Sequence, residues 1–141
     1  MKGDPKVIQH LNKVLANELT AINQYFLHSR MFDNWGLKKL GEHERKESID
    51  EMKHAEVLTD RILFLDGLPN YQRLFAVRIG ETVKEQFECD MLVEQEAIDR
   101  LRNGIEYMRK IGDVCRLNPQ RIGALRRLGS SLGPVMGGGV S

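Results

Sequence analysis

Four residues of this sequence have the types and the spacing of metal ligands: Glu18, Glu51, His54 and Glu94. Glu51 and His54 lie in the stretch ESIDEMKHAE (residues 47–56), and residues three positions apart share one face of a helix. Glu18 and Glu94 each lie inside an apolar series of helical spacing, formed by Leu11, Leu15, Ile22 and Tyr25 around the first and by Met91 and Ile98 around the second. All four side chains are therefore expected to point toward one buried axis.

Several carboxylates cannot be buried together as anions, because burial of an unpaired charge is costly and like charges repel. A multivalent cation removes this conflict, and carboxylate oxygens with an imidazole nitrogen suit iron or manganese better than zinc or magnesium. A Glu-x-x-His pair alone is usually a surface pair, but its coincidence with Glu18 and Glu94 favours a metal site. One glutamate from each of two helices, with Glu-x-x-His on the other two, is the ligand set of di-iron carboxylate bundles.

Other ionisable residues near this pattern have less defined roles. Glu44 and Glu47 continue the acidic line of Glu51, either as a solvated end of the bundle or as a route by which Fe(II) reaches a storage cavity. His10, His28 and His43 lack a comparable setting and are expected at the surface.

Three long helices are expected to position these residues. Asp4 followed by Pro5 predicts a capped helix start, and Gly36 predicts a left-handed end, which gives a first helix over about residues 5–34. A second helix over about 38–66 is closed by DGLP, in which Gly67 can cap and Pro69 forbids continuation. Its expected inner face is Leu40, Glu44, Glu47, Glu51, His54, Leu58 and Ile62.

The third helix begins after Thr82, which forms a predicted capping box with Glu85, and runs over about residues 83–111. Its expected core face is Phe87, Met91, Ile98, Leu101, Ile105 and Met108. The first two helices are joined by a few residues and must be antiparallel, whereas the segment at about 67–81 is long enough to cross the full length of a bundle. We therefore expect an all-α, ferritin-like four-helix bundle with one long crossover.

Composition narrows the class of protein further. The 141 residues, 29% charged and 41% hydrophobic, suit one helical domain, and no apolar run reaches the roughly 18 residues of a membrane span. The N-terminus lacks the apolar core of a signal peptide, so we expect a cytoplasmic protein with no membrane partner. The net charge of +1 argues against nucleic acid as a partner, and Cys89 and Cys115 are expected to be reduced thiols.

The sequence resembles bacterioferritin over about residues 1–113. The resemblance lies in five stretches that occur in order, MKGDPKVIQHLNK, NELTAINQYFLHSRMFDNWGL, ESIDEMKHAE, RILFLDGLPN and IGETVKE. It implies a 24-subunit cage that oxidises Fe(II) with oxygen or peroxide at an intrasubunit di-iron centre and stores ferric mineral. It also implies the iron ligands Glu18, Glu51, His54 and Glu94, with Glu51 bridging the metals and Tyr25 as a hydrogen-bond donor next to them.

Met52 lies about 100° around the helix from Glu51 and belongs to a second, outer stripe. The stripe comprises Leu19, Asn23 and Phe26 on the first helix and Ile49, Met52 and Glu56 on the second. An outer apolar face of this kind is commonly a subunit interface in which methionine fills gaps. The resemblance implies more, namely that Met52 and its two-fold mate are the axial ligands of one b-type haem between two subunits.

The resemblance ends abruptly after IGD. Residues 115–141 contain four arginines, six glycines and no acidic residue, and the positions that match the second Glu-x-x-His hold Arg127 and Ser130. Proline and glycine here predict that the fourth helix and the short fifth helix are lost, so we divide the chain into a ferritin-like part (1–114) and a divergent basic tail (115–141). A shift of reading frame would produce such a tail.

Three functional hypotheses follow. In the first, the chain is a ferroxidase and iron-storage subunit, with an activity impaired by the missing ligands. In the second, it is a haem-binding subunit of a mixed cage in which another subunit oxidises iron. In the third, it is a nonfunctional truncated product, because three helices without a fourth expose a core stripe.

Overall fold

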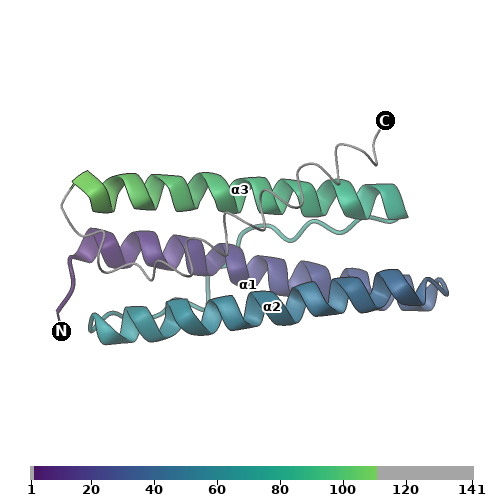
Figure 1. The fold of residues 1–141 in the computed structure, drawn as a ribbon, viewed down its shortest axis with the longest axis horizontal. Helices are drawn as coiled ribbons and strands as arrows, with labels where there is room; N and C mark the ends of the chain where they lie inside the picture. The colour runs from purple at the N-terminus through teal and green to yellow at the C-terminus, as the bar shows by residue number, and fades with distance from the viewer. Residues whose placement is uncertain (1, 111–141) are drawn as a thin grey trace.

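The computed structural model describes residues 2–110, which form three α-helices: α1 (Pro5–Asn34), α2 (Lys38–Phe64) and α3 (Val83–Lys110). Figure 1 shows the three helices side by side along the long axis of the molecule. The described residues contain no strand, which confirms the all-α class, and the helix bounds follow those expected from the sequence closely. The expected loss of a fourth and a fifth helix, and the positions Arg127 and Ser130, lie outside the described residues.

Both ends of α1 are closed by the residues that the sequence indicates. The side chain of Asp4 accepts a hydrogen bond from the backbone N–H of Lys6 (2.7 Å). At the other end Gly36 has a left-handed φ of 81°, and the N–H of Leu37 donates to the carbonyl of Phe32 (2.9 Å). This is a Schellman motif, which turns the chain sharply into α2.

The end of α2 uses a different residue from the one expected. Asp66, with φ 58°, is the left-handed residue, and Gly67 lies one position beyond it, where its N–H donates to the carbonyl of Ile62 (2.9 Å). Gly67 is instead required by packing, because a Cβ there would lie 2.8 Å from Cγ2 of Ile8. The prediction that Gly67 caps the helix is therefore wrong in its detail.

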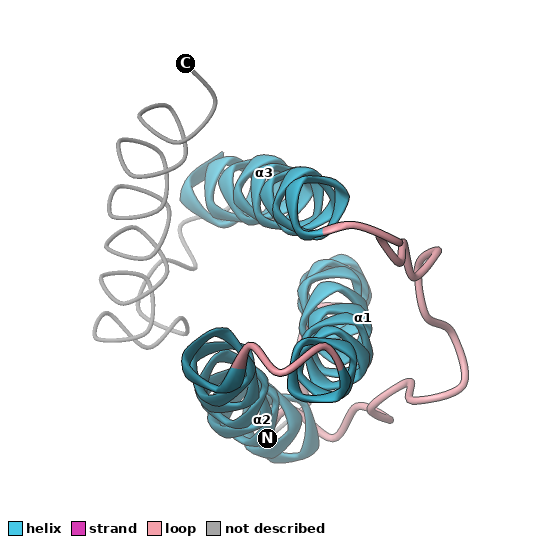
Figure 2. Cartoon of the chain, turned by 90° about the vertical axis from the view of Figure 1, so that its right-hand side faces the viewer, coloured by secondary structure: helices cyan, strands magenta, loops and turns pink. Residues whose placement is uncertain are grey.

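The long connection between α2 and α3 is held along α1 by hydrogen bonds from its backbone. Four side chains of α1 accept them at 2.8 to 3.1 Å: Asn12 from Asn70, Thr20 from Phe75, Gln24 from Arg78 and His28 from Gly80. The acceptors advance along α1 as the donors advance along the connection, so the segment runs parallel to the helix. This confirms the long crossover, which Figure 2 shows passing on the outer side of α1.

The crossover fixes the direction of α3. Because it ends beside His28, near the end of α1, α3 begins there and runs back toward the start of α1, where Tyr107 stacks on His10 with ring centroids 5.0 Å apart. Helix α1 is therefore antiparallel to both α2 and α3, and it packs against both of them.

His28 is fully buried, and the prediction that it lies at the surface is wrong. Its ring lies between the crossover and α3, where Nε2 accepts from the N–H of Gly80 and Nδ1 contacts Asp90. His43 is exposed as expected, and His10 is half-buried against Tyr107.

The apolar core fills one end of the bundle. It comprises Val7, Leu11, Val14 and Leu15 of α1, Ala55, Leu58, Ile62 and Leu65 of α2 and its cap, and Leu101, Ile105 and Met108 of α3. A much smaller cluster of Ala21, Tyr25 and Val93 lies farther along. The buried side chains beyond that point are mostly polar, so the bundle has a dry end and a polar end.

The first half of α3 does not present the expected apolar face. Met91 is exposed, whereas Gln86 and Asp90 are buried. These two polar residues face inward because they have partners there: Gln86 donates to the carbonyl of Gly80 (3.2 Å), and Asp90 contacts α1. Polar partners thus determine the rotation of α3 about its axis in this half.

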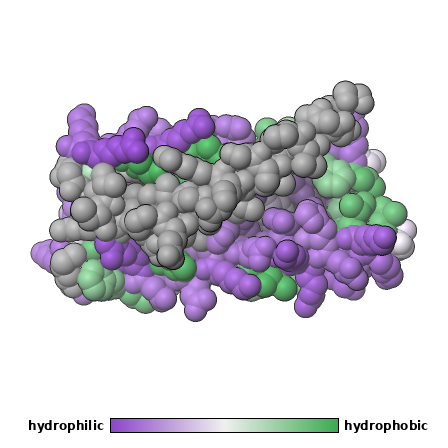
Figure 3. All heavy atoms as spheres, viewed as in Figure 1, coloured by the Kyte–Doolittle hydropathy of each residue, from purple (hydrophilic) through white to green (hydrophobic). Residues whose placement is uncertain are grey.

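The surface drawn in Figure 3 is mostly hydrophilic, with hydrophobic side chains in small patches. Within residues 2–110, none of the helices combines the length and the apolar character that crossing a lipid bilayer requires.

We predict opposite effects for two glycine-to-alanine substitutions. A Cβ at Gly80 would lie 2.2 Å from the backbone nitrogen of Gln86, so Gly80→Ala should destabilise the fold by about 1–3 kcal/mol. Gly104 lies inside α3, where a Cβ would make an ordinary 3.7 Å contact with His10, so Gly104→Ala should stabilise it by up to about 1 kcal/mol. Thermal unfolding followed by circular dichroism measures both, and equal effects would contradict the close approach at Gly80.

Candidate metal centre

Three of the four predicted ligands come together between α1 and α2. Nδ1 of His54 lies 3.2 Å from Oε2 of Glu51 and 3.8 Å from Oε2 of Glu18. One ligand atom from each residue lies within 4.8 Å of the others, a spacing that a single metal ion can span. Glu18 and Glu51 are each only 3% exposed, so their carboxylates meet in a largely dry core.

The helices position this group by simple register. Glu51 and His54 lie one turn apart on α2, and Glu18 faces them from α1. A turn before Glu51, the hydroxyl of Ser48 donates to the carbonyl of Ile22 (2.9 Å), which ties the two helices together beside the group. The three side chains are therefore held by rigid elements rather than by loops.

The fourth predicted ligand, Glu94 of α3, lies outside that group and is held by Tyr25. The Tyr25 hydroxyl donates to Oε1 of Glu94, so the tyrosine contacts the residue that the resemblance implies as an iron ligand. Burial raises the pKa of Glu94 to about 7; the hydrogen bond from Tyr25 opposes this rise, and the nearby charge of Glu18 adds to it. Burial also raises the pKa of Tyr25, and the charge of Glu94 raises it further.

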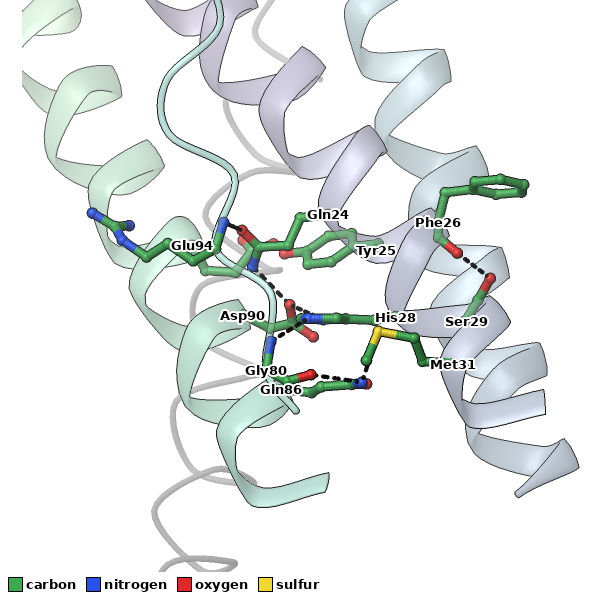
Figure 4. Close-up of polar contacts among 11 residues, drawn as sticks. Gln24, Tyr25, Phe26, His28, Ser29, Met31, Gly80, Gln86, Asp90 and Glu94 are labelled. Atoms are coloured by element: carbon green, nitrogen blue, oxygen red, sulfur yellow. Dashed lines mark hydrogen bonds and ion pairs between the residues drawn. The ribbon is translucent and has the colours of Figure 1, made fainter. Parts of the chain in front are cut away.

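A second buried group, His28, Glu44 and Asp90, was not foreseen from the sequence. One ligand atom from each of the three lies within 4.8 Å of the others, and all three residues are buried. Figure 4 shows His28 and Asp90 directed toward each other, one turn along the helices from Tyr25 and Glu94. The spacing of Thr20, Gln24 and His28 at four-residue intervals on one face was the available signal.

The acidic line of α2 continues into this second group. Glu44 is 4% exposed, and burial, followed by the charge of Asp90, raises its pKa to about 9. Glu47 is only half-buried; burial raises its pKa, and His43 acts against the rise. Glu44 is therefore not part of a solvated end of the bundle, and the alternative, a route by which Fe(II) reaches a storage cavity, stays a prediction.

Met52 lies on the outside of the bundle, where its side chain is exposed. Phe26, Ile49 and Met52 are between 40% and 50% exposed, and they form the apolar side face expected between α1 and α2. A thioether presented on an exposed apolar face fits both an interface between subunits and an axial ligand for haem.

Comparison with known proteins agrees with this arrangement. The model of the ferritin-like domain matches residues 8–116. The chain is 62% identical over 113 residues to a bacterioferritin of Mycolicibacterium paratuberculosis, covering 80% of this chain and 71% of that protein. It is 63% identical over 118 residues to a bacterioferritin of Streptomyces coelicolor (84% and 71%) and 48% identical over 118 residues to one of Rhodobacter capsulatus (84% and 73%).

We predict that Glu44→Gln stabilises the metal-free protein in a pH-dependent way. The pKa of Glu44 is about 9 in the fold and near 4.5 when unfolded, so the folded state holds this proton more tightly. The contribution of protonated Glu44 to the free energy of unfolding is fully present below about pH 4.5 and is lost as the pH rises through 9. Glutamine needs no proton to be neutral. At pH 8 the free energy of unfolding of the variant should therefore exceed that of the wild type by on the order of 3 kcal/mol, and its unfolding temperature should be higher.

The measurement is thermal unfolding with chelator present, at pH 5 and at pH 8, with Glu88→Gln as the control because it removes the same charge from an exposed position of α3. The difference in unfolding temperature between Glu44→Gln and the wild type should be small at pH 5 and large at pH 8. A difference that is independent of pH would show that Glu44 is ionised in the folded protein.

Proposed function

This chain belongs to the ferritin-like family and is related to the bacterioferritins, and from that premise we propose that it is an iron-storage subunit that oxidises Fe(II) and passes Fe(III) to a mineral inside a 24-subunit cage. The observation that carries the proposal is the buried group of Glu18, Glu51 and His54. Two carboxylates and an imidazole, nearly excluded from water, are a ligand set for Fe(II). Relatives named bacterioferritin support iron as the metal.

In the proposed reaction, Fe(II) is the substrate. Glu18, Glu51 and His54 bind one Fe(II), and Glu51 bridges it to a second, for which Glu94, held by Tyr25, is a further ligand from α3. Each Fe(II) gives one electron, and the two electrons with two protons reduce oxygen to hydrogen peroxide, or hydrogen peroxide to two waters. The carboxylates stabilise the resulting Fe(III) because its higher charge binds oxygen anions more strongly. The buried, helix-borne ligands keep both metal positions fixed through this change.

The proposal includes one haem between the apolar side faces of two subunits. Met52 from each of two subunits would hold one b-type haem through its sulfur, with Phe26 and Ile49 as apolar neighbours. When bound, the group supplies a one-electron redox centre whose ferrous state is favoured by thioether ligands. The exposure of Met52 on an apolar face supports this assignment.

A second candidate function rests on Arg127 and Ser130, at the positions that match the missing Glu-x-x-His. Neither can replace a glutamate and a histidine, and an arginine repels iron. The chain would then be the haem-binding subunit of a mixed cage, and a nonfunctional truncated product is the remaining alternative. Fast oxidation of two Fe(II) per chain supports the first function, haem without fast oxidation supports the second, and insolubility without haem supports the third.

Sequencing the gene across the codons for residues 110–141 tests the origin of the tail. If another frame encodes an acidic helix with Glu-x-x-His, the tail is a frameshift product, and ferroxidase activity belongs to the intact form. If the frame is continuous and the native protein has the mass of the 141-residue chain, the frameshift hypothesis is wrong, and the second function gains support.

We predict that the two proposed sites can be removed separately. Met52→Ala should abolish haem binding and leave Fe(II) oxidation intact, whereas Glu18→Ala should slow Fe(II) oxidation at least about tenfold and leave haem bound. The haem absorption spectrum and the stopped-flow absorbance of Fe(III) measure the two activities. Met91→Ala is the matched control, because it removes an exposed methionine from α3 and should change neither. Loss of both activities in each variant would contradict the separation of the two faces.

A further inference from the structure

The carboxylate of Asp90 is held in place by two side chains of α1. Its Oδ1 accepts a hydrogen bond from Nε2 of Gln24 (2.8 Å) and a second from Nδ1 of His28 (3.0 Å). Both donors belong to α1, one turn apart, and Figure 4 shows them converging on Asp90. Oδ1 is thus fully engaged, and the orientation of the whole carboxylate is set by α1.

The same contacts define the tautomer of His28. Its Nε2 accepts the N–H of Gly80 (3.1 Å), so the proton of the neutral ring lies on Nδ1 and is donated to Asp90. Neither ring nitrogen is left for a metal. His28 therefore acts as a positioning residue for Asp90 rather than as a ligand.

Two carboxylate oxygens in this group, Oε2 of Glu44 and Oδ2 of Asp90, receive no hydrogen bond from any backbone or side-chain N–H within the described residues, and the two carboxyl groups can only share a proton with each other. Glu44 is 4% exposed and Asp90 is 6% exposed, so water does not compensate them freely. Their carboxylates approach each other from α2 and α3 as part of a group whose ligand atoms lie within 4.8 Å. A buried acceptor without a donor is costly, and two adjacent ones call for a shared positive charge.

We propose that Glu44 and Asp90 bind a divalent cation of the oxygen-preferring class, such as Mn(II) or Fe(II), at a site separate from Glu18, Glu51 and His54. Two carboxylates completed by water are a common ligand set for such ions. The site shares no residue with the proposed oxidation centre, so it does not depend on the proposed function.

The position of the site suggests how it is used. Glu44 lies seven residues before Glu51 on α2, or two turns and about 10 Å along the helix. Asp90 lies one turn before Glu94 on α3. The cation therefore occupies the next polar layer of the same bundle; its transfer to Glu94 as a substrate is the one part that rests on the proposed function.

The alternative to a bound cation is a proton shared by the two carboxyl groups. The number of Mn(II) ions bound per chain distinguishes these two possibilities. The metal-free full-length chain is titrated with Mn(II), and free Mn(II) is read from its electron paramagnetic resonance signal. We expect Glu44→Gln and Asp90→Asn each to lose one bound Mn(II) per chain, by an affinity loss of more than about 100-fold. Glu88→Gln, which removes an exposed charge from α3, should lose none.

Glu51→Gln should lose a different Mn(II), the one at the proposed oxidation centre. If Glu44→Gln and Asp90→Asn bind as much Mn(II) as Glu88→Gln, the proposal is wrong, whatever happens at Glu51. If only Glu51→Gln retains all of its Mn(II), the proposed iron site fails and the second cation site stands. Helical circular dichroism verifies the fold of each variant.

Where a variant does not fold, wild-type crystals soaked in Mn(II) give the answer by anomalous diffraction. A peak bonded to both Glu44 and Asp90 supports the site. Anomalous density at Glu18 and Glu51 with none beside Glu44 and Asp90 overturns it.

Discussion

The polar half of this bundle is organised by the mutual repulsion of carboxylates that have been taken out of water. Glu18, Glu51 and Glu94 are directed inward from three helices, and Glu44 and Asp90 follow one or two turns away. Each needs a donor, a proton or a cation. Tyr25 donates a hydrogen bond to Glu94, whereas Gln24 and His28 donate to Asp90. Cations fit beside the carboxylate oxygens that receive no such hydrogen bond. The apolar core at the other end of the bundle packs the three helices together without these carboxylates, so the fold tolerates their mutual repulsion.

Helix α1 has two structural tasks on two faces. One face meets α2 with Glu18, and the other accepts backbone hydrogen bonds from the crossover through side chains that include Thr20, Gln24 and His28. Gln24 and His28 take part in both the crossover and the carboxylate layer, since the same side chains bond Asp90. The path of the crossover and the position of α3 are therefore coupled. A displacement of the crossover would move Glu94 and Asp90 together.

Much of this arrangement is readable from the sequence. Capping residues such as Asp4 and Gly36 fix the helix ends locally, and periodicity places Glu18, Glu51 and His54 inward, because neither depends on distant contacts. The inward turn of His28 and Asp90 and the outward turn of Met91 were not readable. A polar side chain that faces a backbone segment has the same helical spacing as one that faces water, and the amides of the crossover carry no side-chain pattern that would reveal the difference.

The crossover is attached to α1 through main-chain N–H groups, while many of its side chains remain exposed, among them Leu68, Tyr71, Leu74 and Val77. This attachment depends on the position of the backbone N–H groups and not on the side chains of the donor residues. Random substitution along this segment should therefore be tolerated broadly, with one amino acid as the exception. Proline has no N–H to donate, so positions 70, 75, 78 and 80 should not tolerate it. The backbone of the segment is thus constrained, whereas exposed side chains such as Leu68 and Val77 can change without moving the metal ligands.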